Sequence, residues 1–509
     1  TFKDYTMAQL QLPLSFEDFI PENHLVRVVN TVVECLDLKP LYDRYKEGGC
    51  PAYHPKMMLK VMIYSFSQKT YSSRQIAKSL RENINFMWIA GGNKPDFRTI
   101  NRFRLDMKDV IEDVFYEVVK LLIEKKYIKL QNYFLDGTKI EANANKYTFV
   151  WNKAVGNYDR KLDEKIKNHL REIDRIVAEE NEIYLEDDLE ETGVNSRITT
   201  GQVEGVVKSI DKKLAKNPMD KKLKKKAKEF KKDILPRKQK YEEAFAIFEG
   251  RNSYSKTDHD ATFMRMKEDA MLNGQLKPGY NVQIGTENRY IVGFTIHPNP
   301  TDTKTMIPHL KHLEKRLGRL PENIVADAGY GSEENYEYLE EKNLGSYVKY
   351  NKFHWEKKKK NRENPYLTDN LPYIAETDRF VCRNGKQLLH IGNRKYVTEA
   401  GYETRRDYYR CEDCTGCPYA TECKNTDKNR TIMVSHRLNE LKRKANANLC
   451  SKRGHKLRSQ RVVEVEQVFG RIKGCWSFRR FHLRGADKVK IEWGLLAIAH
   501  NIAKMALEG

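Results

Sequence analysis

The stretch ENIVADAGYGSEENYEYLEEK, residues 322–342, decides the fold that we predict for this chain of 509 residues. Residues 324–326 form a short apolar run of the kind that makes a buried strand, and Asp327 follows it directly. Two glycines then permit a sharp turn, after which Ser332 can cap a helix. The order strand, turn, helix predicts a mixed α/β protein with an acidic side chain at a strand end.

A second segment, KLQNYFLDGTKIEANANK at residues 129–146, has the same arrangement. Residues 133–135 form an apolar run that is followed directly by Asp136 and Gly137. We therefore predict a buried strand that ends at Asp136.

Further elements of this α/β pattern lie between the two aspartates. GYNVQIGTENRYIVGFTIHPNPTD, residues 279–302, has strand-like runs on both sides of a polar turn, which predicts a hairpin. A helix is predicted over 305–317, and the chain closes with EWGLLAIAHNIAKMAL at 492–507, which we interpret as an amphipathic helix.

The composition favours a polyanionic partner. The formal net charge is +21 and 32% of the residues are charged, so the chain carries both signs with a large basic excess. No apolar stretch approaches the roughly 20 residues that span a bilayer, and the N-terminus lacks the layout of a secretory signal. We expect a cytoplasmic protein, with a length that suits several domains or one core with large insertions.

The first 125 residues are predicted to be helical. YSSRQIAKSLRENINFMWIAGG at 71–92 and DFRTINRFRLDM at 96–107 resemble a helix-turn-helix, with Arg98 and Arg102 together on a polar face. These arginines are candidates for DNA contact, although many helical domains with this pattern touch no DNA.

Two segments look like insertions. Residues 157–250 are rich in Lys and Glu and predict a helical hairpin, which is either a charged spacer or a DNA clamp. Residues 345–455 look irregular, tyrosine-rich and basic, and they contain a cluster of cysteines.

That cluster indicates a metal site. Cys411, Cys414, Cys417 and Cys423 form the pattern C-x2-C-x2-C-x5-C, and nine cysteines in so long a chain are no disulfide scaffold. Four thiolates at this spacing can close a structural Zn²⁺ site. An iron-sulfur cluster stays open as an alternative, and Cys382 can replace one of the four ligands.

A helix predicted near the C-terminus adds a third acid. In VEVEQVFGRIKGCWSFRRFHLRG, residues 463–485, Glu466 stands among basic residues, and Lys473 lies seven residues later, about two helical turns along the same face. Glu464 is turned roughly 200° away from Glu466, so it is the weaker candidate. The alternative is a solvated helix with ordinary charge pairs.

Basic residues on and after this helix are candidates for gripping a DNA backbone. They are Lys473, Arg471, Arg479, Arg480 and Arg484. Trp476 and Phe478 either stack on an unpaired base or belong to the core.

Two strand-end aspartates and a helical glutamate are the residues that two-metal phosphodiester chemistry needs. Carboxylate oxygens suit Mg²⁺ or Mn²⁺, and two ions about 3.5 to 4 Å apart activate a nucleophile and stabilise a leaving oxygen. We predict that Asp136, Asp327 and Glu466 hold these ions, and we interpret Asp302 and Asp260 as supporting acids.

Four segments together resemble the DDE transposases of bacterial insertion sequences, and most closely the insertion-sequence 1182 group. They are PDFRTINRFR at 95–104, FLDGTKIEANANK at 134–146, IVADAGYGS at 324–332 and VEQVFGRIK at 465–473. The resemblance implies an RNase H-like core with Asp136 on the first strand, Asp327 on the fourth and Glu466 on a late helix. Lys473 fits the family's helix motif, whereas the motif's Arg falls on Val462 and the chain has Arg461.

The resemblance also implies a function and a domain order. The expected protein cuts transposon ends and joins the freed 3′-hydroxyl to target DNA, acts as a homodimer in a synaptic complex, and is associated with the bacterial nucleoid. The alternative is a catalytically inactive, domesticated DNA-binding protein. The expected boundaries are 1–125 for the helical DNA-binding domain, 126–156 and 251–344 for the core, 157–250 and 345–455 for the helical and cysteine-containing insertions, and 456–509 for the helices that carry the glutamate.

Overall fold

The computed structural model describes residues 15–45, 52–180, 197–216, 218–266, 274–398 and 400–508. The chain forms two compact units. The first unit comprises residues 1–140, 281–483 and 487–509, and the second comprises residues 141–280 and 484–486. In the described ranges, no helix has the length and apolar character needed to cross a membrane.

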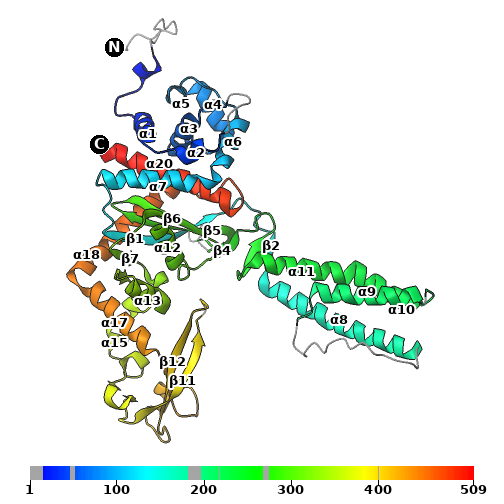
Figure 1. The fold of residues 1–509 in the computed structure, drawn as a ribbon. Coiled ribbons are helices and arrows are strands. Elements are labelled where there is room, and N and C mark those ends of the chain that lie inside the picture. The colour runs from blue at the N-terminus through cyan, green and yellow to red at the C-terminus, as the bar shows by residue number, and fades with distance from the viewer. Residues whose placement is uncertain are drawn as a thin grey trace, which may run out of the picture. The chain divides into compact units, whose positions relative to one another are not determined.

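A mixed sheet forms the centre of the first unit (Figure 1). Its strands follow the order β6-β5-β1-β7-β8, in which β1, β7 and β8 are parallel and the hairpin strands β5 and β6 are antiparallel. Their bounds are β1 (Asn132–Glu141), β5 (Leu276–Glu287), β6 (Tyr290–His297), β7 (Asn323–Ala326) and β8 (Gly345–Val348). This arrangement confirms the mixed α/β class predicted from the sequence.

The register between β1 and β7 aligns the two predicted aspartates. Asn132 pairs with Asn323 and Phe134 with Val325, so the same offset sets Asp136 opposite Asp327. The prediction that the first strand ends at Asp136 is wrong, because β1 continues to Glu141. It can continue because its other neighbour, β5, is 12 residues long and extends the sheet beyond the end of β7.

Helices cover this sheet. Figure 1 shows α7 (Ile111–Glu124) and α20 (Ala486–Glu508) running along it together, and a Cβ added to Gly494 of α20 would lie 2.5 Å from Ile111 of α7. Asn501 of α20 also bonds both backbone groups of Ile291 in β6. Helix α20 is therefore buried from Val489 to Met505 on nearly all sides, and the amphipathic pattern predicted for it is wrong.

The N-terminal part of the first unit is helical, as predicted. Its α-helices are α1 (Leu25–Glu34), α2 (Lys39–Tyr42), α3 (Pro55–Ser67), α4 (Ser73–Glu82), α5 (Ile84–Ile89) and α6 (Phe97–Asp106). The segment 71–92 forms two helices, because Asn83 ends α4 and its side chain accepts from the first amides of α5. Asp96 caps α6 by accepting from Thr99, as expected for an N-cap.

The segment predicted to be irregular contains a five-stranded antiparallel sheet, so that prediction is wrong. Its strands are β9 (Tyr373–Ile374), β10 (Arg379–Val381), β11 (Gln387–Val397), β12 (Glu403–Cys411) and β13 (Thr431–Val434). Most side chains of β11 are exposed, so the alternation that marks a strand with one buried face is missing from its sequence. Two helices, α17 (His436–Cys450) and α18 (Lys452–Arg461), follow this sheet.

The second unit is mostly helical. Its helices are α8 (Asn152–Glu180), α9 (Thr200–Lys216), α10 (Lys221–Glu229) and α11 (Leu235–Phe248), with a π-helical turn η3 (Phe230–Ile234) between the last two. They share an apolar core that includes Leu162, Val203 and Phe230. Lys238 is fully buried and its ammonium is paired with Asp159 and Asp163 at 2.7 and 2.6 Å. The Lys- and Glu-rich segment therefore forms a packed bundle rather than the predicted hairpin.

Candidate active site

Asp136 and Asp327 meet at one basic side chain. The Arg461 guanidinium lies 3.0 Å from Oδ1 of Asp136 and 3.5 Å from Oδ2 of Asp327. The side chains of Arg461 and Asp136 are largely buried, with exposed fractions of 11% and 18%. A single cation thus bridges two carboxylates that arrive from adjacent parallel strands.

Glycines give these carboxylates room. A Cβ at Gly137 would lie 2.2 Å from Nε2 of Gln283 and 2.6 Å from Oδ1 of Asp302, so no larger residue fits there without displacing them. Gly329 is packed similarly, because a Cβ there would lie 3.1 Å from Oδ1 of Asp327. The amides of both glycines donate to the neighbouring aspartates at 2.9 Å.

Asp302 is a third acid at this site. Its Oδ1 accepts from Asn281 at 2.8 Å and from Gln283 at 2.9 Å, and Tyr330 donates to the amide oxygen of Gln283. These bonds orient Asp302 through a buried network on β5. The supporting role predicted for Asp302 agrees with this placement, whereas Asp260 lies in the second unit and caps the amide of Ala486.

The site disfavours a negative charge on Asp136. Burial raises the pKa of its carboxyl to about 6; the Arg461 guanidinium lowers it, and the charges of Asp327 and Asp302 raise it. The carboxyl is therefore easier to protonate than an exposed aspartate, and a bound cation would lower its pKa.

Arg461 reaches the site from the end of α18, where the helix widens. Val462–Glu466 form a π-helical turn, η7, in which hydrogen bonds join residues five apart. Glu466 therefore lies one turn beyond Arg461 and on the same side of the helix. The wide turn lies between Arg461 and Glu466, so Arg461 is five residues before Glu466, one residue earlier than the family spacing.

The two glutamates of this turn have different surroundings. Glu466 is exposed and makes no hydrogen bond or ion pair within the described part of the chain. Glu464 instead accepts from the backbone amide of Arg289, in the turn between β5 and β6, at 2.5 Å. Glu464 thus holds the helix to the sheet.

The basic residues predicted to contact DNA, on this helix and after it, lie in different surroundings. Lys473 and Arg471 are half-buried, and the Arg471 guanidinium lies 5.6 Å from the Trp476 ring centre. Arg479 and Arg480 are exposed. Arg484 belongs to the second unit, where it donates to the carbonyl of Asn143 at 2.6 Å.

The aromatic side chains of this segment belong to the core. Trp476 and Phe478 are 6% and 1% exposed, so neither can stack on a base without unfolding its surroundings. The core interpretation of these rings is therefore confirmed, and the stacking interpretation is wrong.

The cysteines gather only in part. The buried Cys411 lies beside Cys414, and burial raises the pKa of its thiol to about 12, helped by a hydrogen bond to Cys414 and by the nearby Cys382. The sulfur of Cys423 accepts from the Arg430 guanidinium at 3.0 Å, and the sulfur of Cys414 accepts from the Arg430 backbone amide at 3.4 Å. Across the residues that the structure describes, no three His, Cys, Asp or Glu side chains are arranged as metal ligands.

The carboxylates of Asp136 and Asp327 are nonetheless suited to binding a divalent ion between them. Both groups offer hard oxygen atoms, and they already share one cation, the Arg461 guanidinium. Such a pair of carboxylates in a mostly buried site is suited to holding Mg²⁺ or Mn²⁺ against a phosphate.

Two family models match the chain, and both describe transposase domains. A transposase DDE domain matches residues 381–506, and a transposase domain (DUF772) matches residues 14–106. No curated protein and no solved structure matches the chain. The two matches support a DDE-type transposase. The first covers Arg461 and Glu466 but neither aspartate, so the aspartates rest on the geometry described above.

Proposed function

We propose that this protein is a DNA transposase that cuts the ends of a mobile element and joins the freed 3′-hydroxyl to target DNA. The observation that carries this proposal is the side-by-side placement of Asp136 and Asp327 on parallel strands, with one cation between them. The two transposase domain matches support the same conclusion.

Asp136 and Asp327 are the ligands that we propose for two Mg²⁺ or Mn²⁺ ions, with Glu466 as the third ligand. When bound, such ions activate the attacking oxygen and stabilise the leaving oxygen of a phosphodiester. Glu466 is exposed and has no hydrogen-bond or ion-pair partner within the described residues, so its carboxylate is free to turn toward the aspartates when DNA is bound.

Arg461 and Asp302 position these groups. Arg461 balances the two aspartates before catalysis, and we propose that its guanidinium then pairs with a DNA phosphate. Asp302 is held by the amide side chains of Asn281 and Gln283, which fix its carboxyl group beside Asp136.

Duplex DNA is the partner that the basic excess of +21 suits. The side chains proposed to contact its backbone are Arg98, Arg102, Arg471, Lys473, Arg479, Arg480 and Arg484. We further propose that two copies of the chain assemble on paired transposon ends, and that the protein is associated with the nucleoid. We also propose a structural Zn²⁺ ion, which is held by Cys411, Cys414, Cys417 and Cys423.

The proposal is tested by strand cleavage of a labelled transposon end in Mg²⁺. Asp136→Asn, Asp327→Asn and Glu466→Gln should each reduce the cleavage rate on the order of a thousandfold or more, because each removes a metal ligand. Glu464→Gln is the matched control on the same helical turn, and it should cleave within a few-fold of the wild-type rate.

Equal rates for wild type and Asp136→Asn would overturn the assignment of the site. DNA binding without cleavage by the wild-type protein would instead favour the inactive, DNA-binding alternative. A rate lost in Glu464→Gln and kept in Glu466→Gln would move the third ligand to Glu464.

A further inference from the structure

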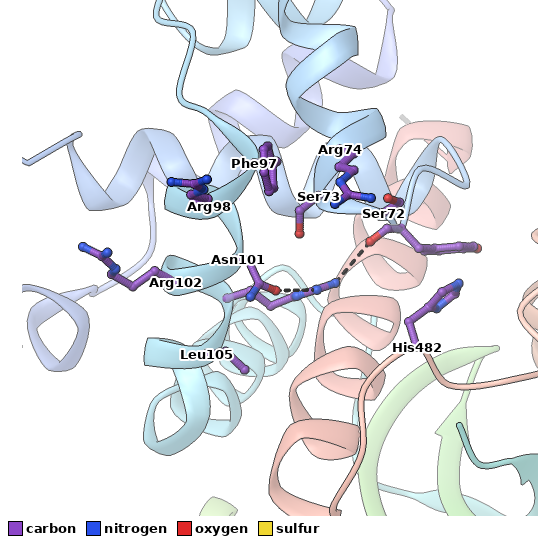
Figure 2. Close-up of a pocket in the computed structure, with 11 residues that line it drawn as sticks. Ser72, Ser73, Arg74, Phe97, Arg98, Asn101, Arg102, Leu105 and His482 are labelled. Atoms are coloured by element: carbon purple, nitrogen blue, oxygen red, sulfur yellow. Dashed lines mark hydrogen bonds between the residues drawn. The ribbon is translucent and has the colours of Figure 1, made fainter. Parts of the chain in front are cut away.

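A basic pocket of about 590 Å³ lies away from the aspartates, in the N-terminal helical region (Figure 2). The start of α4, one face of α6 and His482 form its walls. Figure 2 shows Arg98 and Arg102 leaving the same side of α6, with Ser73 and Arg74 reaching from α4. The volume is far larger than one phosphate group needs and falls in the range of pockets that take small organic ligands.

Positive charge at this pocket is not neutralised locally. Arg74, Arg98 and Arg102 are exposed, and none of them forms an ion pair with the residues that the structure describes. The one acid beside them, Asp96, uses its carboxylate to cap α6. An anionic ligand is therefore favoured on electrostatic grounds.

The floor of the pocket holds a buried cation with spare capacity. Arg104 is 5% exposed, and it donates to the carbonyl of Tyr71 at 3.1 Å and to Asn101 at 2.9 Å. Its Nη1 also forms an ion pair with the buried Glu492 at 3.9 Å, while its Nε is buried without a hydrogen-bond partner. An unpartnered buried donor of this kind is rare in proteins.

The start of α4 adds backbone donors. Ser72 is the N-cap residue of this ten-residue helix, but its side chain makes no capping bond. The first amides of α4 therefore face the pocket without a side-chain acceptor, and together with Arg74 they form a site suited to phosphate.

Flat rings provide a surface for a base. Phe97 is 37% exposed, and the guanidinium groups of Arg74 and Arg98 lie 5.2 and 5.8 Å from its ring centre. The His482 ring lies 5.4 Å from that of Tyr71. Aromatic rings and guanidinium planes are the groups on which unpaired bases stack in nucleic-acid complexes.

We propose that this pocket binds a single unpaired nucleotide of the DNA substrate. Its phosphate lies against Arg74 and the start of α4, and its base lies against Phe97. This inference rests on the proposed function, because it takes DNA as the substrate. It adds that the protein recognises an unpaired position in or beside the transposon end, in addition to the duplex backbone.

The test measures affinity of the full chain, without divalent metal, for two labelled duplexes that differ by one unpaired adenine. Wild type should bind the duplex with the extra nucleotide about tenfold more tightly. Phe97→Leu and Arg74→Ala should each lose this preference while still binding matched duplex. Arg81→Ala removes the same charge from α4 outside the pocket, so it should keep the preference.

A second readout separates the base from the phosphate. With 2-aminopurine at the unpaired position, stacking in the pocket should quench its fluorescence in wild type and in Arg81→Ala, and Phe97→Leu should restore it. An abasic unpaired position should be bound no more tightly than matched duplex.

Several results would overturn the proposal. Equal wild-type affinity for the two duplexes would do so. A preference for the unpaired adenine that both Phe97→Leu and Arg74→Ala retain would also overturn it. So would an equal loss of this preference in Arg81→Ala. Displacement of the DNA by free dAMP at micromolar concentration would assign the pocket to a free nucleotide instead. If wild type cleaves transposon ends yet shows no preference, the pocket proposal fails and the proposed function stands; absence of all DNA binding overturns both.

Discussion

At the scale of single residues, Arg461 occupies the position between the carboxylates that a divalent ion would need. The guanidinium and the ion cannot both neutralise Asp136 and Asp327 from that position. Metal binding should therefore include the release of Arg461, and the affinity for the ion should contain the free energy of breaking this contact.

Arg461→Gln should consequently bind Mn²⁺ more tightly than wild type, by roughly tenfold, because two repelling carboxylates are left without their cation. Titration of the DNA-free protein followed by the electron paramagnetic resonance of free Mn²⁺ measures this change. Arg458→Ala, on the same helix, serves as the control. An unchanged or weaker affinity in Arg461→Gln would mean that the ion binds elsewhere than between the two aspartates.

Glu492 is a second residue whose charge is set by its surroundings. It is fully buried in α20, and burial raises the pKa of its carboxyl from 4.5 to about 7, although the amides of Leu483 and His482 and the Arg104 guanidinium oppose this. The folded protein holds this proton more tightly than the unfolded chain does. The resulting stability is present below about pH 4.5 and is lost as the pH rises through about 7.

Glu492→Gln should remove this part of the pH dependence, which is on the order of 3 kcal/mol between the two limits. Urea unfolding at pH 5 and pH 8 measures it. Wild type should lose more stability across this range than Glu492→Gln, whereas Glu341→Gln, at an exposed position on helix α13 (Glu333–Glu341), should follow wild type. Parallel pH profiles for wild type and Glu492→Gln would show that this carboxyl is not protonated in the folded state.

At the scale of elements, strands β1 and β7 explain a success of sequence-based prediction, and the π-helical turn η7 explains a failure. The positions of the two aspartates are predictable because each follows a local apolar run. The parallel pairing of β1 with β7 then places them opposite each other. The sequence does not identify Arg461 as their partner, because the spacing of the family motif falls on Val462. A sequence pattern with the α-helical period of 3.6 residues per turn does not show that one turn contains an extra residue.

Deletion of Val463 tests this explanation. Val463 is 47% exposed, and its removal changes the separation of Arg461 and Glu466 from five residues to four, which is one ordinary α-helical turn. The shortened helix should keep both side chains on the same side, and cleavage should stay within about tenfold of wild type. A loss as large as that expected for Glu466→Gln would show that the wide turn itself is needed.

The cysteine-containing sheet carries the next prediction at this scale. If Cys411, Cys414, Cys417 and Cys423 hold Zn²⁺, the purified protein should contain one zinc per chain by mass spectrometry of the metal. Cys411→Ser and Cys414→Ser should abolish it, whereas Cys35→Ser, at an exposed position, should not. Loss of zinc in Cys382→Ser would place that thiol in the ligand set. Iron with visible absorbance would favour the cluster alternative, and a metal-free protein would overturn both.

At the scale of the whole molecule, local sequence patterns predict less of the structure than they do at the candidate active site. The sequence of β11 does not show a strand pattern because most of its side chains are exposed. The burial of α20 is not evident from its sequence because the helix carries polar residues such as Asn501, whose side chain bonds to the backbone of Ile291 inside the core. Such burial depends on partners far away in the sequence, which single-segment periodicity does not contain.

The basic charge of the whole chain leads to a last prediction. It distinguishes basic side chains that bind DNA from basic side chains that only face solvent. Each phosphate contact that is lost should lower the slope of log affinity against log salt concentration by about 0.9. Arg479→Ala with Arg480→Ala should reduce the slope by roughly two, because both side chains are exposed next to the proposed active-site helix. Lys222→Ala with Lys225→Ala removes the same charge from exposed positions of α10 in the second unit. It should leave the slope unchanged if that unit is a spacer, whereas a reduction equal to that of the arginine pair would identify the bundle as a DNA clamp.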